Sequence, residues 1–549
     1  MPLALINLLK GRFWTWVPVC FSLLLSSCHD AGRNKNIFHY NEQSGIATLD
    51  PAFAKNQSII WAVHQIYNTL VQTDDSLRLV PSLAKSWDIS PDNLTYTFHL
   101  RTDVYFQDND AFPGGQGRRM IAKDVVYSFT RILDINTASS GAWIFNNRVD
   151  ALRPFTAVDD TTFQLKLAAP FQPILGIVSM QYCSVIAREA VDKYGKDFRR
   201  HPCGTGPFQF VAWEEGQALI LKKNPHYFET DSARNRLPYL DGIKVSFFQN
   251  KATEFLEFQQ GRLDFINDID PSFKDEVITK EGTLRKQWTG KITLVKHPYL
   301  NIEYLGILND TSLELVRNSP LSNLKVRQAI NYGFNRRKMM LYIRNSIGIP
   351  AESGFIPAGL PSFDSSKVIG YRYDPAKALQ LLREAGYPNG IGLPVIKLIT
   401  IPAYAEFASY IASELQQVGI KIEVETVEKS LLLEETAKSD ALFFRGSWIA
   451  DYPDAENFLG VFYGKNPAPP NYTRYKNIAF DRLYERSLAE KNDTARMRID
   501  QMADQLMIRQ APVVPLWYDV VIRLQHTYLI NFSPNSLNLL ELRKTRIGN

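Results

Sequence analysis

The stretch PVIKLITIPAYAEFASYIASELQQVGIKIEVETV, residues 394–427, decides the fold class of this chain. Its first part, 394–401, is an apolar run of strand length, and its last part, 420–427, alternates apolar and polar residues. Between them, residues 403–419 carry apolar side chains at helical spacing and end at a glycine. Strand, helix and strand in this order predict a parallel βαβ unit with a right-handed crossover, and therefore an α/β domain.

The segments on either side extend this pattern. Downstream, ALFFRGSWI (441–449) is a mostly apolar run, which we expect to be a further strand of the same sheet. Upstream, residues 374–386 have an aspartate suited to cap a helix, a proline at the first helical position and a glycine stop. Ser322 or Asn323 is placed to cap a helix that the sequence predicts over residues 324–343.

The earlier part of the chain, from about residue 68 to 192, is rich in strand patterns. Residues 94–101 alternate apolar and polar side chains, which predicts a half-buried strand. The turn sequence before them favours pairing with residues 86–89. Residues 201–228 open with a glycine turn and predict two more strands around residues 214–216.

The first 28 residues indicate the compartment. A basic start precedes the apolar run Phe13–Leu25, which is too short to span a bilayer comfortably. The run leads into LSSC, which resembles a bacterial lipobox, where the cysteine becomes the first mature residue and carries the lipid. We therefore expect residues 1–27 to be a lipoprotein signal peptide, Cys28 the lipidation site and residues 28–36 a polar tether. A signal peptide cut elsewhere, or an N-terminal membrane helix, is the alternative.

The charge and hydropathy of the remaining chain exclude other classes. The formal charge of +5 falls to +3 without residues 1–27, because Lys10 and Arg12 leave and no acid does. This weak charge, with no basic run, argues against a nucleic-acid-binding protein. No later stretch approaches eighteen uninterrupted apolar residues, so we expect no further membrane span. We expect the body of the protein to be a soluble monomer.

The cysteines fall into two groups. Cys20 leaves with the signal peptide and Cys28 takes the lipid, so that Cys183 and Cys203 remain. In an exported chain two cysteines can persist as a disulfide, which is our prediction for this pair. Two buried free thiols are the alternative.

Signatures of catalysis are missing from the sequence. We find no GxSxG, HExxH, P-loop or GxGxxG pattern. The eight histidines are scattered, and none lies two or four residues from another. We therefore predict no metal site, no cofactor and no catalytic step.

Two opposite charges mark the segment FFRGSWIADYPDAENF, residues 443–458. Arg445 and Asp451 lie six residues apart in an apolar and aromatic run, so both would face the same side of an extended strand. Six residues of strand span roughly 20 Å. The gap suits a short extended ligand that is charged at both ends. The alternative is that neighbouring groups of the protein neutralise each charge.

An ordered set of segments carries a family resemblance. After the lipobox come TLDPAFAKNQSIIWAVHQIYNTLV, LVPSLAKSWDISPDNLTYTFHLR, DVVYSFTRI, GTGPFQF, VRQAINYGFNRRKM, YDPAKALQLLREAGY and SWIADYPDAENFL. In this order and spacing the chain resembles the extracytoplasmic solute-binding proteins of peptide ABC importers, family 5, the oligopeptide- and dipeptide-binding group. The similarity covers essentially the whole mature chain, and the ordered set is specific although no single motif is.

The resemblance implies a fold. It is an α/β, two-lobed periplasmic-binding-protein-like fold (class II, cluster C) with an extra β-rich domain. Lobe I would comprise residues 37–67, 193–298 and 521–549, the β-rich domain residues 68–192, and lobe II residues 299–520. A hinge between the lobes would let them close over an extended peptide.

The resemblance also implies a ligand site. In the family, an aspartate in a segment like WIADY takes the α-ammonium of the peptide, and an arginine six residues earlier can take the carboxylate of short peptides. The strand between them, and the residues just after TLDP, would hold the peptide backbone. The implied ligand-binding residues are Asp451, Arg445, Gly446, Ser447, Trp448, Ile449, Tyr452, Lys55, Asn56 and Gln57. The chain departs from the family at Ile449, where some relatives carry a cysteine, so that their cross-link is missing.

The function implied is that of a lipid-anchored receptor facing the bacterial periplasm. It would bind di- or oligopeptides and deliver them to the permease subunits of an ABC importer in the inner membrane, without catalysis. The same architecture could instead bind a nickel chelate, haem, an opine or an oligosaccharide, although Asp451 favours an amine-bearing ligand. An exported hydrolase is a rival of a different class, and it lacks a clustered nucleophile and base.

Overall fold

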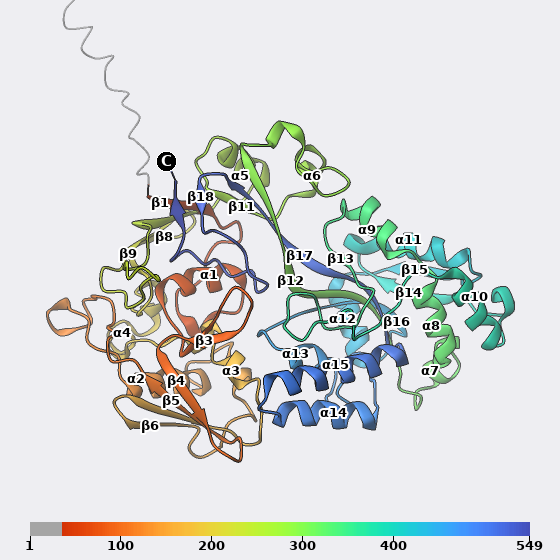
Figure 1. The fold of residues 1–549 in the computed structure, drawn as a ribbon, viewed down its shortest axis with the longest axis horizontal. Coiled ribbons are helices and arrows are strands. Elements are labelled where there is room, and N and C mark those ends of the chain that lie inside the picture. The colour runs from red at the N-terminus through yellow and green to blue at the C-terminus, as the bar shows by residue number, and fades with distance from the viewer. Residues whose placement is uncertain (1–35, 549) are drawn as a thin grey trace, which may run out of the picture.

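The computed structural model describes residues 36–548 as a mixed α/β structure with several sheets (Figure 1). The predicted signal peptide, Cys28 and the tether before residue 36 lie outside the described residues. Within the described range, no helix has both the length and the apolar character needed to cross a membrane.

Distant segments of the chain form a first, four-stranded sheet. β1 (Ile37–Asn41) runs parallel to β10 (Gly242–Ser246), and β9 (Ala218–Lys223) and β8 (Phe208–Glu214) follow in antiparallel order. The two strands predicted from residues 201–228 are thus confirmed as β8 and β9. Gly216, in the turn that joins them, has a φ of 76°, a left-handed conformation that favours glycine.

A second, antiparallel sheet matches the strand-rich pattern of the early chain. Its order is β4 (Ala84–Ile89), β5 (Thr95–Leu100), β7 (Thr162–Lys166) and β6 (Phe155–Asp159). The apolar residues of β5 are buried and alternate with partly exposed polar ones, as predicted, and β4 is its predicted partner. The amphipathic helix α2 (Ala122–Leu133) packs against β6 and β7.

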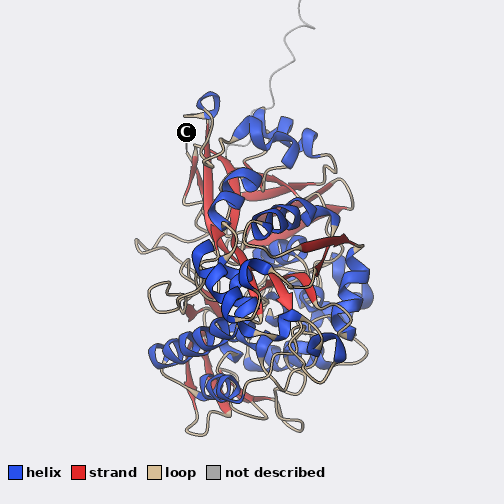
Figure 2. Cartoon of the chain, turned by 90° about the vertical axis from the view of Figure 1, so that its right-hand side faces the viewer, coloured by secondary structure: helices blue, strands red, loops and turns tan. Residues whose placement is uncertain are grey.

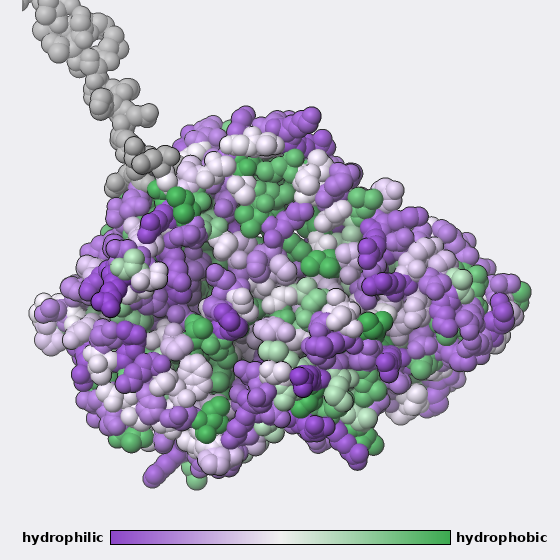
Figure 3. Space-filling view, in the orientation of Figure 1, coloured by the Kyte–Doolittle hydropathy of each residue, from purple (hydrophilic) through white to green (hydrophobic). Residues whose placement is uncertain are grey.

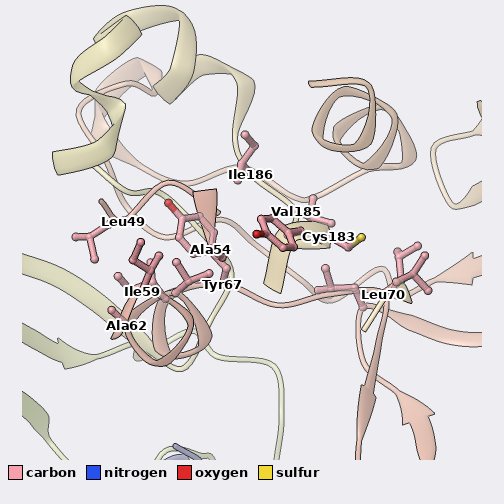
Figure 4. Packing of buried hydrophobic residues seen from close by; sticks show 14 of the residues in the cluster. Leu49, Ala54, Ile59, Ala62, Tyr67, Leu70, Cys183, Val185 and Ile186 are labelled. Carbon is pink, nitrogen blue, oxygen red and sulfur yellow. The ribbon is translucent and has the colours of Figure 1, made fainter. Parts of the chain in front are cut away.

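These two sheets share one hydrophobic interior. Figure 4 shows Ile59 and Tyr67, which precede the strand-rich segment, packed with Leu70 and Val185, which belong to it. Buried side chains of β1 and β5 belong to the same cluster. The strand-rich segment is therefore joined to the first sheet by core packing.

The predicted disulfide is wrong, because Cys183 and Cys203 are both buried free cysteines. Cys183 ends the short helix η4 (Gln181–Cys183), and Sγ of Cys203 lies 3.5 Å from the backbone oxygen of Gln107, to which it donates. Burial raises the pKa of both thiols, which keeps them protonated and unreactive. Each thiol behaves as a small apolar group in the shared interior.

Two long strands run through the largest sheet. β12 (Ile292–Ile307) and β17 (Val513–His526) pair antiparallel along most of their length. β11 (Phe265–Asn267) pairs with the C-terminal end of β17, whereas β16 (Phe443–Ile449) pairs with the C-terminal half of β12. β13 (Ile349–Pro350) also pairs with β17. One end of the β12–β17 pair therefore lies beside β11, and the other end lies beside β16 and β13.

The predicted parallel βαβ unit is confirmed. β14 (Ile396–Thr400) runs parallel to β15 (Ile422–Thr426), with α11 (Ala405–Gln416) between them in the chain. α12 (Lys429–Lys438) leads on to β16, which is also parallel to β14. The segment that carries Arg445 and Asp451 is thus the last strand of this unit and the turn after it.

The helix predicted over residues 324–343 is wrong in its continuity, because the structure has two helices there. α8 (Leu324–Tyr332) ends, and α9 (Arg336–Arg344) begins after three intervening residues. Oδ1 of Asn335 accepts the backbone N–H of Lys338 at 3.0 Å and so caps α9.

The predicted helix starts on either side are confirmed. Oδ1 of Asn323 accepts the backbone N–H of Lys325 at 2.9 Å at the start of α8. Oδ1 of Asp374 accepts that of Lys377 at 2.9 Å at the start of α10 (Pro375–Glu384). Figure 2, seen from the right-hand side of Figure 1, shows helices of this C-terminal part in front of its strands.

β12 and β17 connect the two halves of the molecule. The N-terminal half, red to yellow, lies on the left of Figure 1 together with the blue C-terminal end and β18 (Leu529–Ile530), and the α/β half, green to blue, lies on the right. The pairing of the two strands is irregular midway, where the register shifts between Pro298 and Ile302, opposite Val520 and Tyr518. Two of the boundaries predicted from the family resemblance, 298/299 and 520/521, lie beside this irregularity, and the division into lobes stays a prediction.

The halves also meet through polar contacts around α14 (Ile478–Ala489). Nδ2 of Asn93 donates to the backbone oxygen of Ala489 at 3.0 Å, and Nζ of Lys491 donates to that of Ser90 at 2.9 Å. The turn between β4 and β5 is thereby tied to the C-terminal half.

Candidate functional site

A cavity of about 640 Å³ lies between the two halves. Figure 3 shows a hollow near the middle of the molecule, where the halves meet. The start of α1 (Gln57–Ile66), the segment 140–182 and residues near the C-terminus line one side of the cavity. Tyr299 and the turn after β16 line the other. The cavity thus collects residues that are far apart in the sequence.

Asp451 is the one acidic residue among the described residues that line the cavity. Its backbone N–H donates to Oδ1 of Asn457 at 3.2 Å, and Nε1 of Trp448 donates to the same oxygen at 3.1 Å. These two bonds hold the turn against the end of β16. No ion pair to Asp451 is found among residues 36–548. The cavity therefore presents a carboxylate without a counter-charge bound to it.

The surroundings of Asp451 favour a cationic partner. The cavity walls desolvate the carboxylate and raise its pKa, and the hydrogen bond from Asn457 and the charge of Arg148 oppose this shift only in part. The residue itself is exposed to the cavity, so the shift reflects nearby walls rather than a dry interior. A cation beside Asp451 would stabilise its charged form.

The opposite wall is formed at the start of α1. Lys55, Asn56 and Gln57 all line the cavity, as the family resemblance predicts for the ligand site. Oδ1 of Asn56 accepts the backbone N–H of Ile59 at 3.2 Å, which caps the helix and fixes the position of this wall.

The rest of the wall is largely aromatic and apolar. Trp143, Met180, Tyr182 and Tyr299 line the cavity, and none of them was predicted as a site residue. They come from separate segments, and no local pattern in the sequence marks them as neighbours. Such a lining can accept bulky side chains of a ligand without fixing their identity.

One edge of β16 is open next to the cavity. β12 pairs with β16 from Phe443 to Ile449, whereas β14 pairs with it at Ile399 and Phe444 only. Beyond Phe444, no described strand pairs with the second edge of β16. An open edge of this kind is a template for an extended segment, which would add to the sheet as a further strand. The edge leads to Ile449, which lines the cavity.

Arg445 is occupied within the protein. Its Nη2 donates to Oε2 of Glu303 at 2.6 Å, and its guanidinium lies 3.9 Å from the ring centroid of Tyr404. The hydroxyl of Tyr404 donates to the other oxygen of Glu303 at 3.1 Å. Only 11% of the Arg445 side chain and 4% of the Glu303 side chain are exposed. Arg445 is not among the residues that line the cavity.

Four further predicted residues of β16 and its turn, Gly446, Ser447, Trp448 and Tyr452, do not line the cavity either. Gly446 allows close packing, because a Cβ there would lie 2.6 Å from the ring of Tyr304. Ser447 is partly exposed opposite Glu303, and Trp448 packs on the core of the C-terminal half. The buried hydroxyl of Tyr452 hydrogen-bonds to a buried glutamate, Glu456. The structure therefore brings Asp451, Ile449, Lys55, Asn56 and Gln57 together at the cavity, and leaves Arg445, Gly446, Ser447, Trp448 and Tyr452 outside its lining.

Side chains that could bind a metal ion do not cluster among the described residues. Over residues 36–548, no cluster of three or more histidine, cysteine or acidic side chains could hold a metal ion.

Two halves joined by crossing strands, with a cavity between them, define a two-lobed periplasmic binding protein. The chain belongs to the bacterial extracellular solute-binding proteins of family 5, whose model of the middle region matches residues 78–470. The family and the fold class predicted from the sequence are thereby confirmed. Members of this family are the solute-binding components of ABC importers.

Three known proteins illustrate the relationship. The chain is 30% identical to heme-binding protein A of Haemophilus influenzae, over 83% of this chain and 82% of that protein. It is 25% identical to the dipeptide-binding protein of Escherichia coli K12, over 83% and 84% of the two chains. The structure of DppA of Helicobacter pylori in complex with the peptide STSA superposes with a TM-score of 0.69 at 24% identity, and 93% and 98% of the chains are covered.

Proposed function

We propose that the protein binds peptides in the cavity between its lobes and delivers them to the permease subunits of an ABC importer. In this proposal Asp451 takes the α-ammonium of the peptide, and the open edge of β16 pairs with the peptide backbone. Lipid on Cys28 anchors the monomeric protein to a membrane, with its body facing the periplasm. No catalytic step is involved.

The observation that carries the proposal is the free carboxylate of Asp451 at the end of an open strand edge. A peptide has an ammonium at one end and a row of backbone donors and acceptors behind it, so it matches both features at once. The mixed aromatic wall accommodates side chains without requiring one sequence. The names of the dipeptide-binding relative and of the peptide complex support the same ligand class.

A calorimetric titration of four combinations tests the contact with Asp451. Wild type and Asp451→Ala are each titrated with free and with N-acetylated peptides. Losing one partner of a buried charge pair costs about 2–5 kcal/mol, or roughly thirty- to several-thousand-fold in affinity. Acetylation should weaken binding to the wild type by this amount and binding to Asp451→Ala hardly at all.

A variant of a partly exposed aspartate outside the cavity lining, Asp364→Ala, is the matched control and should bind like the wild type. If acetylation and Asp451→Ala weaken binding additively, then Asp451 does not contact the amine. Turnover of the peptides would contradict the proposal of a pure binding protein.

Haem is a second candidate ligand, since a 30% identical relative is named a heme-binding protein and the cavity wall is rich in aromatic rings. Among the described residues that line the cavity, there is neither a histidine nor a cysteine. Native mass spectrometry of freshly purified protein distinguishes the candidates, because a bound peptide and a bound haem differ in mass and haem also absorbs visible light.

A further inference from the structure

The ion pair between Arg445 and Glu303 has the geometry of a bound carboxylate. The two residues lie diagonally across β16 and β12, because Glu303 pairs in register with Ser447 and Arg445 with Leu305. Glu303 receives the Nη2 hydrogen of Arg445 at 2.6 Å and the hydroxyl hydrogen of Tyr404 at 3.1 Å. A carboxylate from the ligand would need these same donors.

The position of the pair relates it to the cavity. Arg445 and Asp451 lie on the same segment, and the open edge of β16 runs from one toward the other. A ligand that places its ammonium at Asp451 and extends along this edge therefore runs toward Arg445. The group that it presents there meets a guanidinium that is already neutralised.

Charge balance disfavours a second carboxylate at this place. Arg445 and Glu303 form the pair itself, and the hydroxyl of Tyr404 hydrogen-bonds to it. Asp519 on β17 forms a second ion pair, with Arg344 of α9 at 3.0 Å. These two cations are matched by the two carboxylates of Glu303 and Asp519. Asn301 donates to Asp519 at 2.8 Å. Adding a ligand carboxylate would leave one buried negative charge uncompensated, and this is costly in a low-dielectric site.

We propose that Glu303 acts as a built-in carboxylate on Arg445, so that the protein selects ligands with a free amine and with an uncharged group, not a carboxylate, opposite Arg445. This inference rests on the proposed binding of peptides. It specifies the ligand class further: a peptide whose C-terminal carboxylate lies beyond the pair, or whose end is amidated, is preferred to one whose carboxylate falls on Arg445.

The burial of Glu303 is consistent with this role. Desolvation raises the pKa of Glu303 to about 7, although the charge of Arg445 lowers it and that of Asp519 raises it. The second nitrogen of the guanidinium, Nε of Arg445, is buried and makes no hydrogen bond among the described residues. A neutral ligand carbonyl could accept from such a donor without adding charge.

The test uses two peptide libraries of identical sequences, two to six residues long, one with free C-terminal acids and one with C-terminal amides. Each is mixed in equimolar amounts with the mature protein, and native mass spectrometry measures the bound ratio of acid to amide at each length. For the wild type we expect no length at which the acid is preferred by more than about threefold. In Glu303→Gln, where Arg445 has lost its charged partner, we expect acids of one length to be preferred by at least about tenfold.

The double variant Glu303→Gln/Arg445→Gln is the matched control, and it should lose this acid preference. Thermal unfolding of each variant shows that it is folded, and the ratio in the wild type tests the proposal even if a variant does not fold. A preference of about tenfold or more for acids of any length in the wild type would overturn the inference but not the proposed function. An unchanged ratio in folded Glu303→Gln would also overturn it. Binding of no peptide from either library by the wild type would overturn the proposed function itself, and the inference with it.

Discussion

Arg445 of β16 donates a hydrogen bond of 2.6 Å to Glu303 of β12, and both side chains are almost completely buried. Breaking a buried pair by removing one partner leaves an uncompensated charge. We expect Arg445→Ala to lower the free energy of unfolding by about 3–5 kcal/mol, measured by urea unfolding near pH 8. The loss should shrink toward pH 5.5, because Glu303 can then take up a proton.

The matched control for this variant is Arg337→Ala. Arg337 pairs with Glu352 at 2.7 Å, but 71% of its side chain is exposed. A pair of this kind contributes less than about 1 kcal/mol. Equal stability of Arg445→Ala and the wild type would show that the buried pair is not a structural element.

The protonation of buried Asp504 should make the free energy of unfolding fall as the pH rises. It is buried, its oxygens accept the backbone N–H groups of Phe355 at 2.8 Å and Ile356 at 3.2 Å, and desolvation raises its pKa to about 7. The folded state therefore holds the proton more tightly than the unfolded state, where the pKa is about 3.9. The stability linked to this proton is complete below about pH 4 and is lost as the pH rises to about 7.

Replacing Asp504 with asparagine should flatten this dependence. The urea midpoints at pH 5.5 and pH 8 should differ less in Asp504→Asn than in the wild type. Part of the dependence of stability on pH should remain, because the pKa values of Glu303 and Asp500 are also raised to about 7. Asp364→Asn is the control, since hydrogen bonds lower the pKa of Asp364 and keep it charged over this range. A steeper slope in Asp504→Asn would contradict the assignment.

The two core cysteines should both react as free thiols once the chain is unfolded. A protein that begins at His29 contains only Cys183 and Cys203. We expect two labels per chain in denaturant without reductant, and almost none in the native state, because both residues are 0% exposed. Labelling that appears only after reduction would mean that a disulfide had formed after all.

Cys28 should carry the lipid anchor. The pattern LSSC follows a short apolar run, which is typical of lipoprotein processing. In bacterial cells, Cys28→Ser should abolish acyl labelling and move the protein from the membrane to the soluble fraction. Cys20→Ser, within the predicted signal peptide, is the control and should leave both unchanged. Undiminished labelling of Cys28→Ser would place the lipid elsewhere.

Local patterns predicted much of this fold, because they depend on neighbours in the chain. The alternation of residues 94–101 and the cap at Asp374 concern few residues each, and both are confirmed. The break before Asn335 was missed, since the apolar spacing continues across it, although Gly333 caps the end of the first helix and Asn335 caps the start of the second.

The site was only partly predictable, because it depends on contacts between distant segments. Asp451 and Asn56 were found through the family resemblance, and they line one cavity. Glu303 was missed, although an acid inside the apolar run NIEYLGI is a signal that it needs a buried partner. The identity of that partner follows from the register of β12 and β16, which no local pattern contains.

The passage of β12 and β17 between the lobes has a mechanical consequence. The connections are hydrogen-bonded strands and not slack linkers, so sliding one lobe past the other would break the ladder on both sides of the irregular segment between Pro298 and Ile302. We infer that the lobes rotate relative to each other about a single hinge axis at this segment. Each closure of this kind would return Asp451 to the same place over the start of α1. In the proposed transport function, the permease would then recognise a loaded receptor by the outline of its closed form, without contacting the cargo.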